Sequence, residues 1–140
     1  MKVDYYILNY DLASRLQFAC RLVAKAYLSA QTVFVYCADL SACEIIDTLL
    51  WSFKKDSFIP HVIIHELQEN LDMIPILIGY EMPALQYDIL LNLTNDIPIF
   101  YNSFNRIIEI VDENNKQQAR KNYSQYKNNN CKLQTHTINS

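Results

Sequence analysis

The chain contains a single glycine, Gly79, among its 140 residues. Phosphate-binding P-loops, dinucleotide fingerprints and nucleophile elbows need glycines at fixed positions, because the backbone must turn sharply or approach a ligand closely. One glycine cannot supply any of these motifs. The sequence therefore excludes the common nucleotide-binding loops and the nucleophile-elbow hydrolases.

Paired cysteines and long apolar runs are also lacking. The four cysteines form no C-x-x-C pair, and they do not cluster with histidines as zinc ligands do. No apolar run reaches about 18 residues, the length that spans a bilayer. The first residues lead directly into a strand-like pattern, so we expect no signal peptide. We therefore expect no metal, no cofactor and no membrane contact, with reduced thiols in a cytoplasm.

Acidic residues are absent from residues 114–140, which carry five basic residues. The first 113 residues hold the other seven basic and all fifteen acidic residues, a formal net charge of −8. An acidic body repels duplex DNA, so DNA is a poor partner for the whole molecule. The basic C-terminal segment instead indicates an acidic partner.

The first half of the chain alternates between strand and helix patterns. Residues 3–8 and 32–36 are rich in β-branched and aromatic side chains and predict strands. Apolar residues at positions 12, 16, 19, 23 and 26 predict a helix to about residue 29, with Asp11 as its N-cap. This order is typical of an α/β fold with parallel strands.

A second helix is predicted after residue 36, with Asp39 or Ser41 as its cap and its end near Trp51. Four apolar side chains are expected to face inward from it: Ile45, Ile46, Leu49 and Leu50.

The second half of the chain predicts more strands and one further helix. Asp112 or Asn114 is expected to cap a polar helix that ends near residue 128. The expected strands are residues 62–64, 74–78, 86–91 and 104–111, with a short helical turn at 97–101. We predict an α/β domain over residues 1–130 with a mixed, largely parallel sheet, followed by an extended tail over residues 131–140.

No combination of residues predicts catalysis. His61 and His65 would share a metal only on a helix, but Pro60 and the apolar residues between them favour a strand, so we interpret both as structural or surface histidines. Cys37 ends a predicted buried strand without a partner base, which indicates an inert thiol. The carboxylates near element ends are interpreted as caps: Asp4, Asp11, Asp39 and Asp88.

The C-terminal helix carries the clearest binding pattern. Lys116, Arg120, Tyr123 and Lys127 recur at helical spacing and share one face. Arginine can clamp a carboxylate with two hydrogen bonds, and tyrosine offers a rigid apolar wall with a polar tip. The face suits a short peptide that is acidic and hydrophobic, although a solvated helix with incidental charges explains the same pattern.

Residues 51–61 place two large aromatics, Trp51 and Phe58, on either side of a charged turn. A turn normally buries its bulky apolar groups or lacks them. Aromatics in this position are candidates for an exposed anchor, because binding energy at protein–protein interfaces concentrates in such side chains.

The chain resembles the chi subunit of bacterial DNA polymerase III, an accessory subunit of the clamp-loader complex, over nearly its full length. The order and spacing of several segments carry this resemblance rather than any one motif. These segments are Tyr5-Tyr6-Ile7-Leu8, Leu50-Trp51, Ser57-Phe58-Ile59-Pro60-His61, Asp88-Ile89-Leu90-Leu91-Asn92-Leu93, and Ala119-Arg120 with Tyr123 and Tyr126.

The resemblance implies a three-layer Rossmann-like domain without a nucleotide site, and a non-catalytic adaptor in the bacterial cytoplasm that reaches DNA only indirectly. It implies that a psi subunit binds near Trp51 and Phe58, a surface that some members use for a helicase-like repair protein. It also implies that the acidic, Phe-ended C-terminal tail of single-stranded DNA-binding protein binds beside the C-terminal helix. The matching positions are Val111, Arg120, Tyr123, Leu133 and Thr135. Where the family often has lysine this chain has Ser124, and Lys121 or Lys127 could substitute for it, with Lys127 on the better face of the helix.

Two other functions remain open on the sequence. A small Rossmann-like enzyme could use Cys37 or a carboxylate at a strand end, in which case a deep polar pocket should lie there. The basic helix could instead bind nucleic acid directly.

Overall fold

The computed structural model describes residues 1–53, 58–64 and 74–140. In chain order its elements are β1 (Lys2–Leu8), α1 (Arg15–Leu28), β2 (Val33–Tyr36), α2 (Leu40–Ser52), β3 (His61–Ile63), β4 (Ile76–Gly79), β5 (Ile89–Asn92), the 3₁₀ helix η1 (Tyr101–Ser103), β6 (Arg106–Val111), α3 (Lys116–Asn128) and β7 (Lys132–Ile138). No helix of this described part is long and apolar enough to cross a membrane.

The seven strands form one sheet in the order β3-β4-β2-β5-β6-β1-β7. Every pairing in it is parallel, so the prediction of a mixed sheet was wrong on this point. A parallel neighbour requires the chain to return across the sheet, and the helices supply such crossovers. The end of the chain, which we expected only to be extended, is the edge strand β7 beside β1.

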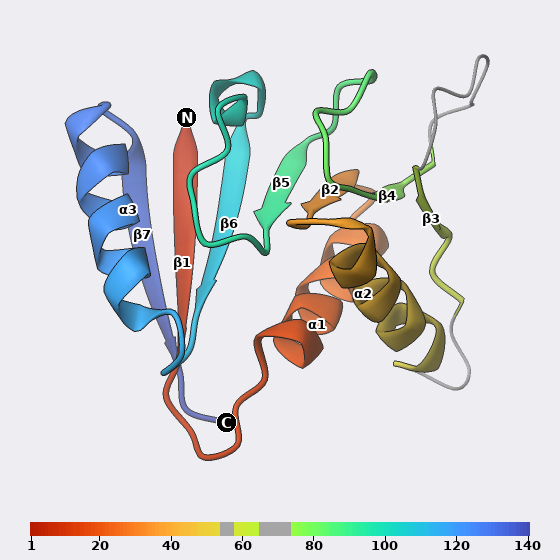
Figure 1. Ribbon diagram of the computed structural model, residues 1–140, viewed down its shortest axis with the longest axis horizontal. Helices are drawn as coiled ribbons and strands as arrows, with labels where there is room; N and C mark the ends of the chain where they lie inside the picture. The colour runs from red at the N-terminus through yellow and green to blue at the C-terminus, as the bar shows by residue number, and fades with distance from the viewer. Residues whose placement is uncertain (54–57, 65–73) are drawn as a thin grey trace.

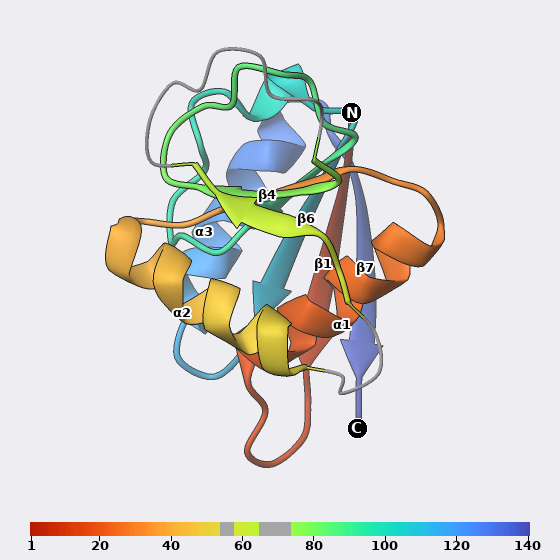
Figure 2. The ribbon, with the colours of Figure 1, turned by 90° about the vertical axis from the view of Figure 1, so that its right-hand side faces the viewer.

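Helices cover both faces of the sheet, which confirms the predicted three-layer α/β arrangement. α1 and α2 pack on one face, and α3 lies on the other beside β7 (Figure 1). Figure 2, turned so that the β3 side of Figure 1 faces the viewer, shows α1 and α2 together toward the front and α3 behind the front strands. The sheet is therefore buried on both sides, and the continuous apolar runs of its central strands follow from this burial.

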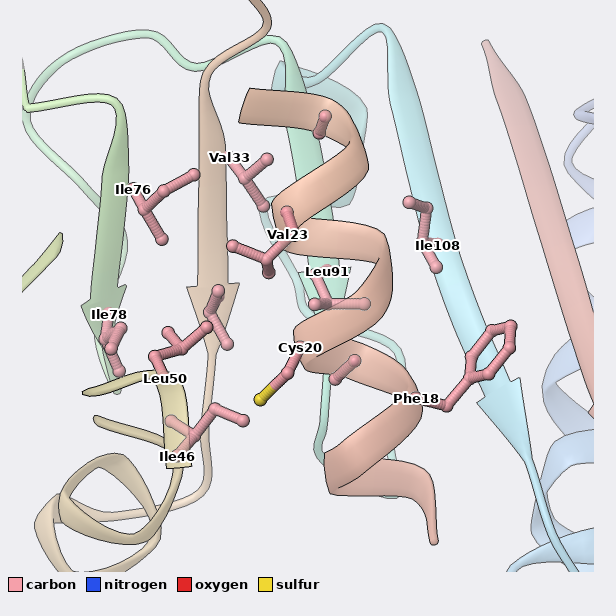
Figure 3. Packing of buried hydrophobic residues seen from close by; sticks show 14 of the residues in the cluster. Phe18, Cys20, Val23, Val33, Ile46, Leu50, Ile76, Ile78, Leu91 and Ile108 are labelled. Atoms are coloured by element: carbon pink, nitrogen blue, oxygen red, sulfur yellow. The ribbon is translucent and has the colours of Figure 1, made fainter. Parts of the chain in front are cut away.

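The larger apolar cluster lies between the sheet and the α1–α2 layer. Phe18 of α1 lies against β6, the strand that carries Ile108, whereas Val23 of α1 and Ile46 of α2 lie toward the central strands (Figure 3). Each such side chain is almost fully buried, and burial of one large apolar side chain contributes about 1.5–3 kcal/mol. The periodic apolar residues of the two helices therefore hold this layer on the sheet.

The beginnings of these helices differ from the prediction in one case. Ser14, not Asp11, caps α1 by accepting a hydrogen bond from the Gln17 amide. Leu12, which we assigned to the apolar face of this helix, lies in the preceding loop and is fully exposed. Asp39 caps α2 as predicted, by accepting from the Ala42 amide at 2.9 Å.

The inward face of α2 is narrower than predicted. Cys43, Ile46 and Leu50 are buried, at spacings of three and four residues, whereas Ile45 is 53% exposed. Adjacent residues such as Ile45 and Ile46 point in different directions, because successive helical residues are separated by about 100°.

Two helices end without glycine at positions where glycine is usual. Ala30 after α1 and Asn130 after α3 have positive φ angles of 58° and 64°. At the second of these ends the amide of Cys131 donates to the Tyr126 carbonyl and that of Asn130 to the Lys127 carbonyl. These two hydrogen bonds close the helix and direct the chain into β7. Asparagine suits this position because it tolerates the left-handed backbone better than most residues.

Candidate protein-interaction sites

The first candidate site lies along α3. Ala119, Asn122 and Tyr126 face the sheet, and Tyr126 is fully buried. Lys116, Arg120, Tyr123 and Lys127 lie within an arc of about 60° when successive residues are placed 100° apart, roughly a quarter turn from the sheet-facing direction. We call these four residues the cationic flank.

The contacts of α3 show toward which strands the cationic flank is turned. The sheet-facing Asn122, which points away from the cationic flank, donates to the carbonyl of Asn95 in the connection between β5 and β6. Tyr123 instead packs edge-on against Tyr5 of β1, with 5.3 Å between the ring centroids. The cationic flank therefore faces β1 and the edge strand β7.

The strand register places the other residues assigned to peptide binding. Leu133 and Thr135 pair in register with Val3 and Tyr5 of β1, on the α3 side of the sheet. Leu133 is half-buried and Thr135 is exposed, so both reach the surface beside the cationic flank. Val111 is only 6% exposed and lies beneath α3, where it contributes to the floor rather than to the surface.

Among the described residues, one of the three cations of the cationic flank has an ion-pair partner. Lys116 Nζ lies 3.7 Å from Glu113 Oε1 in an exposed pair. Within the described residues, no carboxylate lies within 4 Å of Arg120 or Lys127. Arg120 and Lys127 therefore present unpaired positive charge next to the half-buried ring of Tyr123.

A buried polar cluster supports α3 from below. Glu109 of β6 accepts hydrogen bonds from the Tyr126 hydroxyl at 2.7 Å and from Asn92 Nδ2 at 2.9 Å, both at Oε2. Burial raises the pKa of Glu109 to about 7, against the lowering effects of Asn92, Tyr126 and Arg15. Burial also raises the pKa of Tyr126, and the Glu109 charge raises it further. The Glu109 carboxyl group thus links α3, which carries the cationic flank, to β6 and β5.

The second candidate site is an exposed aromatic pair at the end of α2. Trp51 and Phe58 are 57% and 61% exposed, and their ring centroids lie 5.1 Å apart. The neighbouring Ile59 is buried in the larger apolar cluster. Because this side chain anchors the segment, the adjacent Phe58 is held at the surface against the tryptophan.

His61 forms the floor of the aromatic pair. Its ring centroid lies 4.7 Å from that of Trp51, and its side chain is 1% exposed. Nδ1 lies 2.6 Å from the Ile59 carbonyl, so this nitrogen carries a proton and donates. Nε2 lies 3.2 Å from Asp47 Oδ1, without an aligned hydrogen bond.

One of the two histidines that the chain spaces four residues apart lies in the described part of the structure. His61 lies in strand β3 as expected, whereas His65 lies outside the described residues. No local pattern connects His61 with Trp51, because their contact depends on how α2 and β3 meet. The role of Tyr5 beneath Tyr123 was also missed, although the two-residue period of residues 3–8 places it on one face with Val3.

A small Rossmann-like enzyme would place its reactive groups at the carboxyl ends of the strands. Cys37, directly after β2, is buried, and burial raises the pKa of its thiol with a further contribution from Cys43. A raised pKa disfavours the thiolate that a nucleophile needs. A cleft at the ends of β1 and β6 contains Asp112, but its Oδ1 accepts from the amides of Asn114 and Asn115 before α3. Asp112 thus orders the chain before this helix, whose N-cap residue is Asn115.

The two candidate sites lie at opposite ends of the sheet. β3 and β7 are its outermost strands, and Figure 1 shows α2 with β3 at one end and α3 with β7 at the other. Six inter-strand steps of about 4.8 Å separate the edges by roughly 29 Å. The two candidate sites therefore do not share surface.

Comparison with known proteins gives a consistent result across the chain. A family model described as "DNA polymerase III chi subunit, HolC" matches residues 1–134. The DNA polymerase III subunit chi of Pseudomonas aeruginosa is 36% identical over 98% of this chain and 96% of its own length. The subunit chi of Haemophilus influenzae is 30% identical over 96% of both chains, and that of Escherichia coli is 26% identical over 88% of both.

Among solved structures, the crystal structure of T4 UvsW superimposes with a TM-score of 0.70 at 9% sequence identity. The match covers 99% of this chain and 41% of that one. At this identity the similarity concerns the fold alone.

Proposed function

Because the chain belongs to the DNA polymerase III chi subunit family, we propose that it is a non-catalytic adaptor of the clamp-loader complex in the bacterial cytoplasm. The aromatic pair Trp51–Phe58 docks a psi-type subunit, or a repair helicase in its place. The surface between the cationic flank and β7 holds the acidic C-terminal tail of single-stranded DNA-binding protein. The adaptor thereby tethers the clamp loader to coated single strands.

The separation of the two surfaces carries the bridging part of this proposal. The aromatic pair and the cationic flank belong to opposite edges of one continuous sheet. A rigid spacer of roughly 29 Å lets both partners bind together, and linked binding raises the effective concentration of each partner near the other. No chemistry in the adaptor is required for this effect.

The composition of the α3–β7 surface supports an acidic, Phe-ended peptide. The segment from residue 114 to the chain end carries five positive charges and no negative charge. Arg120 can hold a carboxylate with two hydrogen bonds, and the half-buried Tyr123 ring offers an apolar wall for a phenylalanine. Charge attraction of this kind mainly increases the association rate and its dependence on salt.

Arg120→Ala is expected to weaken binding of a tail peptide by about 1–3 kcal/mol, the usual cost of removing a hydrogen bond to a charged group. A titration of fluorescein-labelled peptide followed by fluorescence anisotropy measures the loss. Lys25→Ala is the matched control, because Lys25 is an exposed cation on α1, across the sheet from α3. Equal affinities of the two variants would remove Arg120 from the site.

The same titration addresses direct binding of nucleic acid. The proposed adaptor should bind the tail peptide at physiological salt and show no measurable binding to a naked single-stranded oligonucleotide, since its body carries a net charge of −8. Tighter binding to the oligonucleotide than to the peptide would favour the nucleic-acid alternative.

Trp51→Ala is expected to weaken the complex with a psi-type partner by at least about 2 kcal/mol, because exposed tryptophans at interface centres dominate binding energy. Phe58→Ala should act in the same direction, since its ring packs on Trp51. Co-purification and calorimetry measure the effect, with Leu28→Ala as the control for loss of an exposed apolar side chain. Binding of the tail peptide should be unchanged in both aromatic variants. If both variants also kept partner binding, the docking surface would lie elsewhere.

A further inference from the structure

The outer edge of β7 is the most unusual feature of the α3–β7 surface. β7 is seven residues long and pairs with β1 on one side only. An edge strand presents unpaired backbone N–H and C=O groups, and proteins usually shorten, charge or cover such edges. β7 carries a single lysine at its start and contains no arginine, aspartate or glutamate. Its edge is therefore suited to accept a further strand.

The hydrogen bonds to β1 identify which backbone groups face outward. The amide of Lys132 donates to the Met1 carbonyl at 3.0 Å, and the carbonyl of Ile138 accepts from the Asn9 amide at 2.7 Å. Even-numbered residues of β7 thus turn their backbone groups toward β1. Along a strand the next residue points the other way, so Leu133, Thr135 and Thr137 direct three N–H and three C=O groups outward. No described residue forms a backbone hydrogen bond with these six groups.

The cationic flank lies beside this edge. α3 runs back along β7, because only residues 129–131 join the two elements. With rises of about 1.5 Å per helical residue and 3.3 Å per strand residue, Lys127 stands near the start of β7 and Arg120 roughly level with Thr135. A strand added to β7 would therefore run beneath two positive charges and the wall formed by Tyr123.

We propose that the acidic tail adds to β7 as an eighth strand, with its backbone bonded to Leu133, Thr135 and Thr137. This inference rests on the proposed function and specifies how that peptide is held. Backbone bonds of an added strand are independent of sequence, so the cationic flank supplies the preference for an acidic segment. A second copy of this chain fits the edge poorly, because pairing two copies would bring two cationic C-terminal segments together.

Amide hydrogen exchange followed residue by residue by NMR tests the proposal. In the free protein the amides of Leu133, Thr135 and Thr137 should exchange fast, and saturating tail peptide should slow them by at least about tenfold. The amides of Gln134 and His136, which already face β1, are the internal control and should be protected in both states. A peptide that binds by anisotropy without slowing the odd-numbered amides would overturn strand addition and leave the adaptor function standing.

Two further outcomes of this experiment are decisive. A peptide that does not bind at all would remove the proposed function, and strand addition with it. Protection of the odd-numbered amides in the free protein that increases with protein concentration, together with a dimer mass in sedimentation, would show that a second copy occupies the edge and would overturn the proposal.

A backbone substitution provides an independent test. Thr137→Pro removes an outward N–H and leaves the bonds to β1 in place, because proline is tolerated where the amide faces solvent. We expect Thr137→Pro to lose at least about tenfold in peptide affinity, whereas Thr137→Val, which keeps the amide, should lose less than about threefold. Equal affinity of the two variants would overturn strand addition. Should Thr137→Pro fail to fold, the exchange measurement on the unmodified chain decides.

Discussion

Tyr126→Ala is expected to lower the free energy of unfolding by about 3–5 kcal/mol, the range for removing a large aromatic side chain from a core. Tyr126 is fully buried and contacts Tyr5 and Tyr101 edge-on, with ring centroids 6.3 and 5.7 Å away. Its hydroxyl also donates to Glu109 at 2.7 Å. The substitution therefore leaves both a cavity under α3 and a buried carboxyl group without one of its partners.

Urea unfolding measures this loss, and Tyr126→Phe separates its two causes. The phenylalanine variant keeps the packing and removes only the hydroxyl, so we expect it to lose about 1–3 kcal/mol. Because Tyr126 fixes α3 to the sheet, the alanine variant should also bind the tail peptide more weakly. An alanine variant as stable as the unmodified protein would show that α3 is held by other contacts.

The free energy of unfolding is expected to fall by about 3 kcal/mol between pH 4.5 and 7 through Glu109 alone. Burial raises the pKa of this carboxyl from its ordinary value of 4.5 to about 7, and each pKa unit corresponds to about 1.4 kcal/mol. Between these pH values the folded protein keeps a proton that the unfolded chain releases. The stabilisation is therefore complete below the unfolded pKa and is lost as the pH rises through the folded one.

Glu109→Gln should remove this component. Glutamine is neutral at every pH, and its carbonyl oxygen can accept from Tyr126 and Asn92 in place of Oε2. Urea unfolding of both proteins from pH 4.5 to 8 should give stabilities that agree at the acid end, with the variant the more stable at pH 8. The difference between the two curves cancels the groups that they share, and parallel curves would show that Glu109 keeps the same protonation state in the folded and unfolded protein.

Asp4 is expected to affect stability in a different pH range. Burial acts to raise the pKa of this carboxyl, but hydrogen bonds from His136 and Arg106 and the charges of Arg106 and Lys2 outweigh it and lower the pKa below 3.8. The stabilisation from Asp4 is present above the unfolded pKa and is lost as the pH falls through the folded value. This range does not overlap with that of Glu109.

Most of the fold could be predicted from local patterns. The apolar run predicted at residues 32–36 is observed as Val33–Tyr36, and the strand predicted at residues 3–8 as Lys2–Leu8. Such runs are informative because central parallel strands are buried on both faces. The start of α1 was misplaced because Leu12 fits the helical period by spacing alone, although it stands in the loop before Ser14. Periodicity does not mark where the backbone leaves a helix.

The candidate sites were predictable to a lesser degree. The shared face of Lys116, Arg120, Tyr123 and Lys127 follows from helix geometry, and the comparisons confirmed the family on which the other site residues depend. The buried role of Glu109 could not be foreseen, because Asn92 and Tyr126 each lie 17 residues away in the chain. The same holds for His61, whose contacts with Trp51 and Asp47 join β3 to α2.

The amino-acid order by itself determined the element types, the absence of glycine-dependent loops and the concentration of positive charge after residue 113, because these depend on near neighbours and composition. Only the tertiary structure decided that α3 turns its cationic flank toward β7, that the chain end is an edge strand, and that the odd-numbered residues of that strand face outward. These features depend on which distant strand, β1, takes the place beside β7. No local pattern specifies that choice, since pairing partners are selected by the packing of the whole sheet.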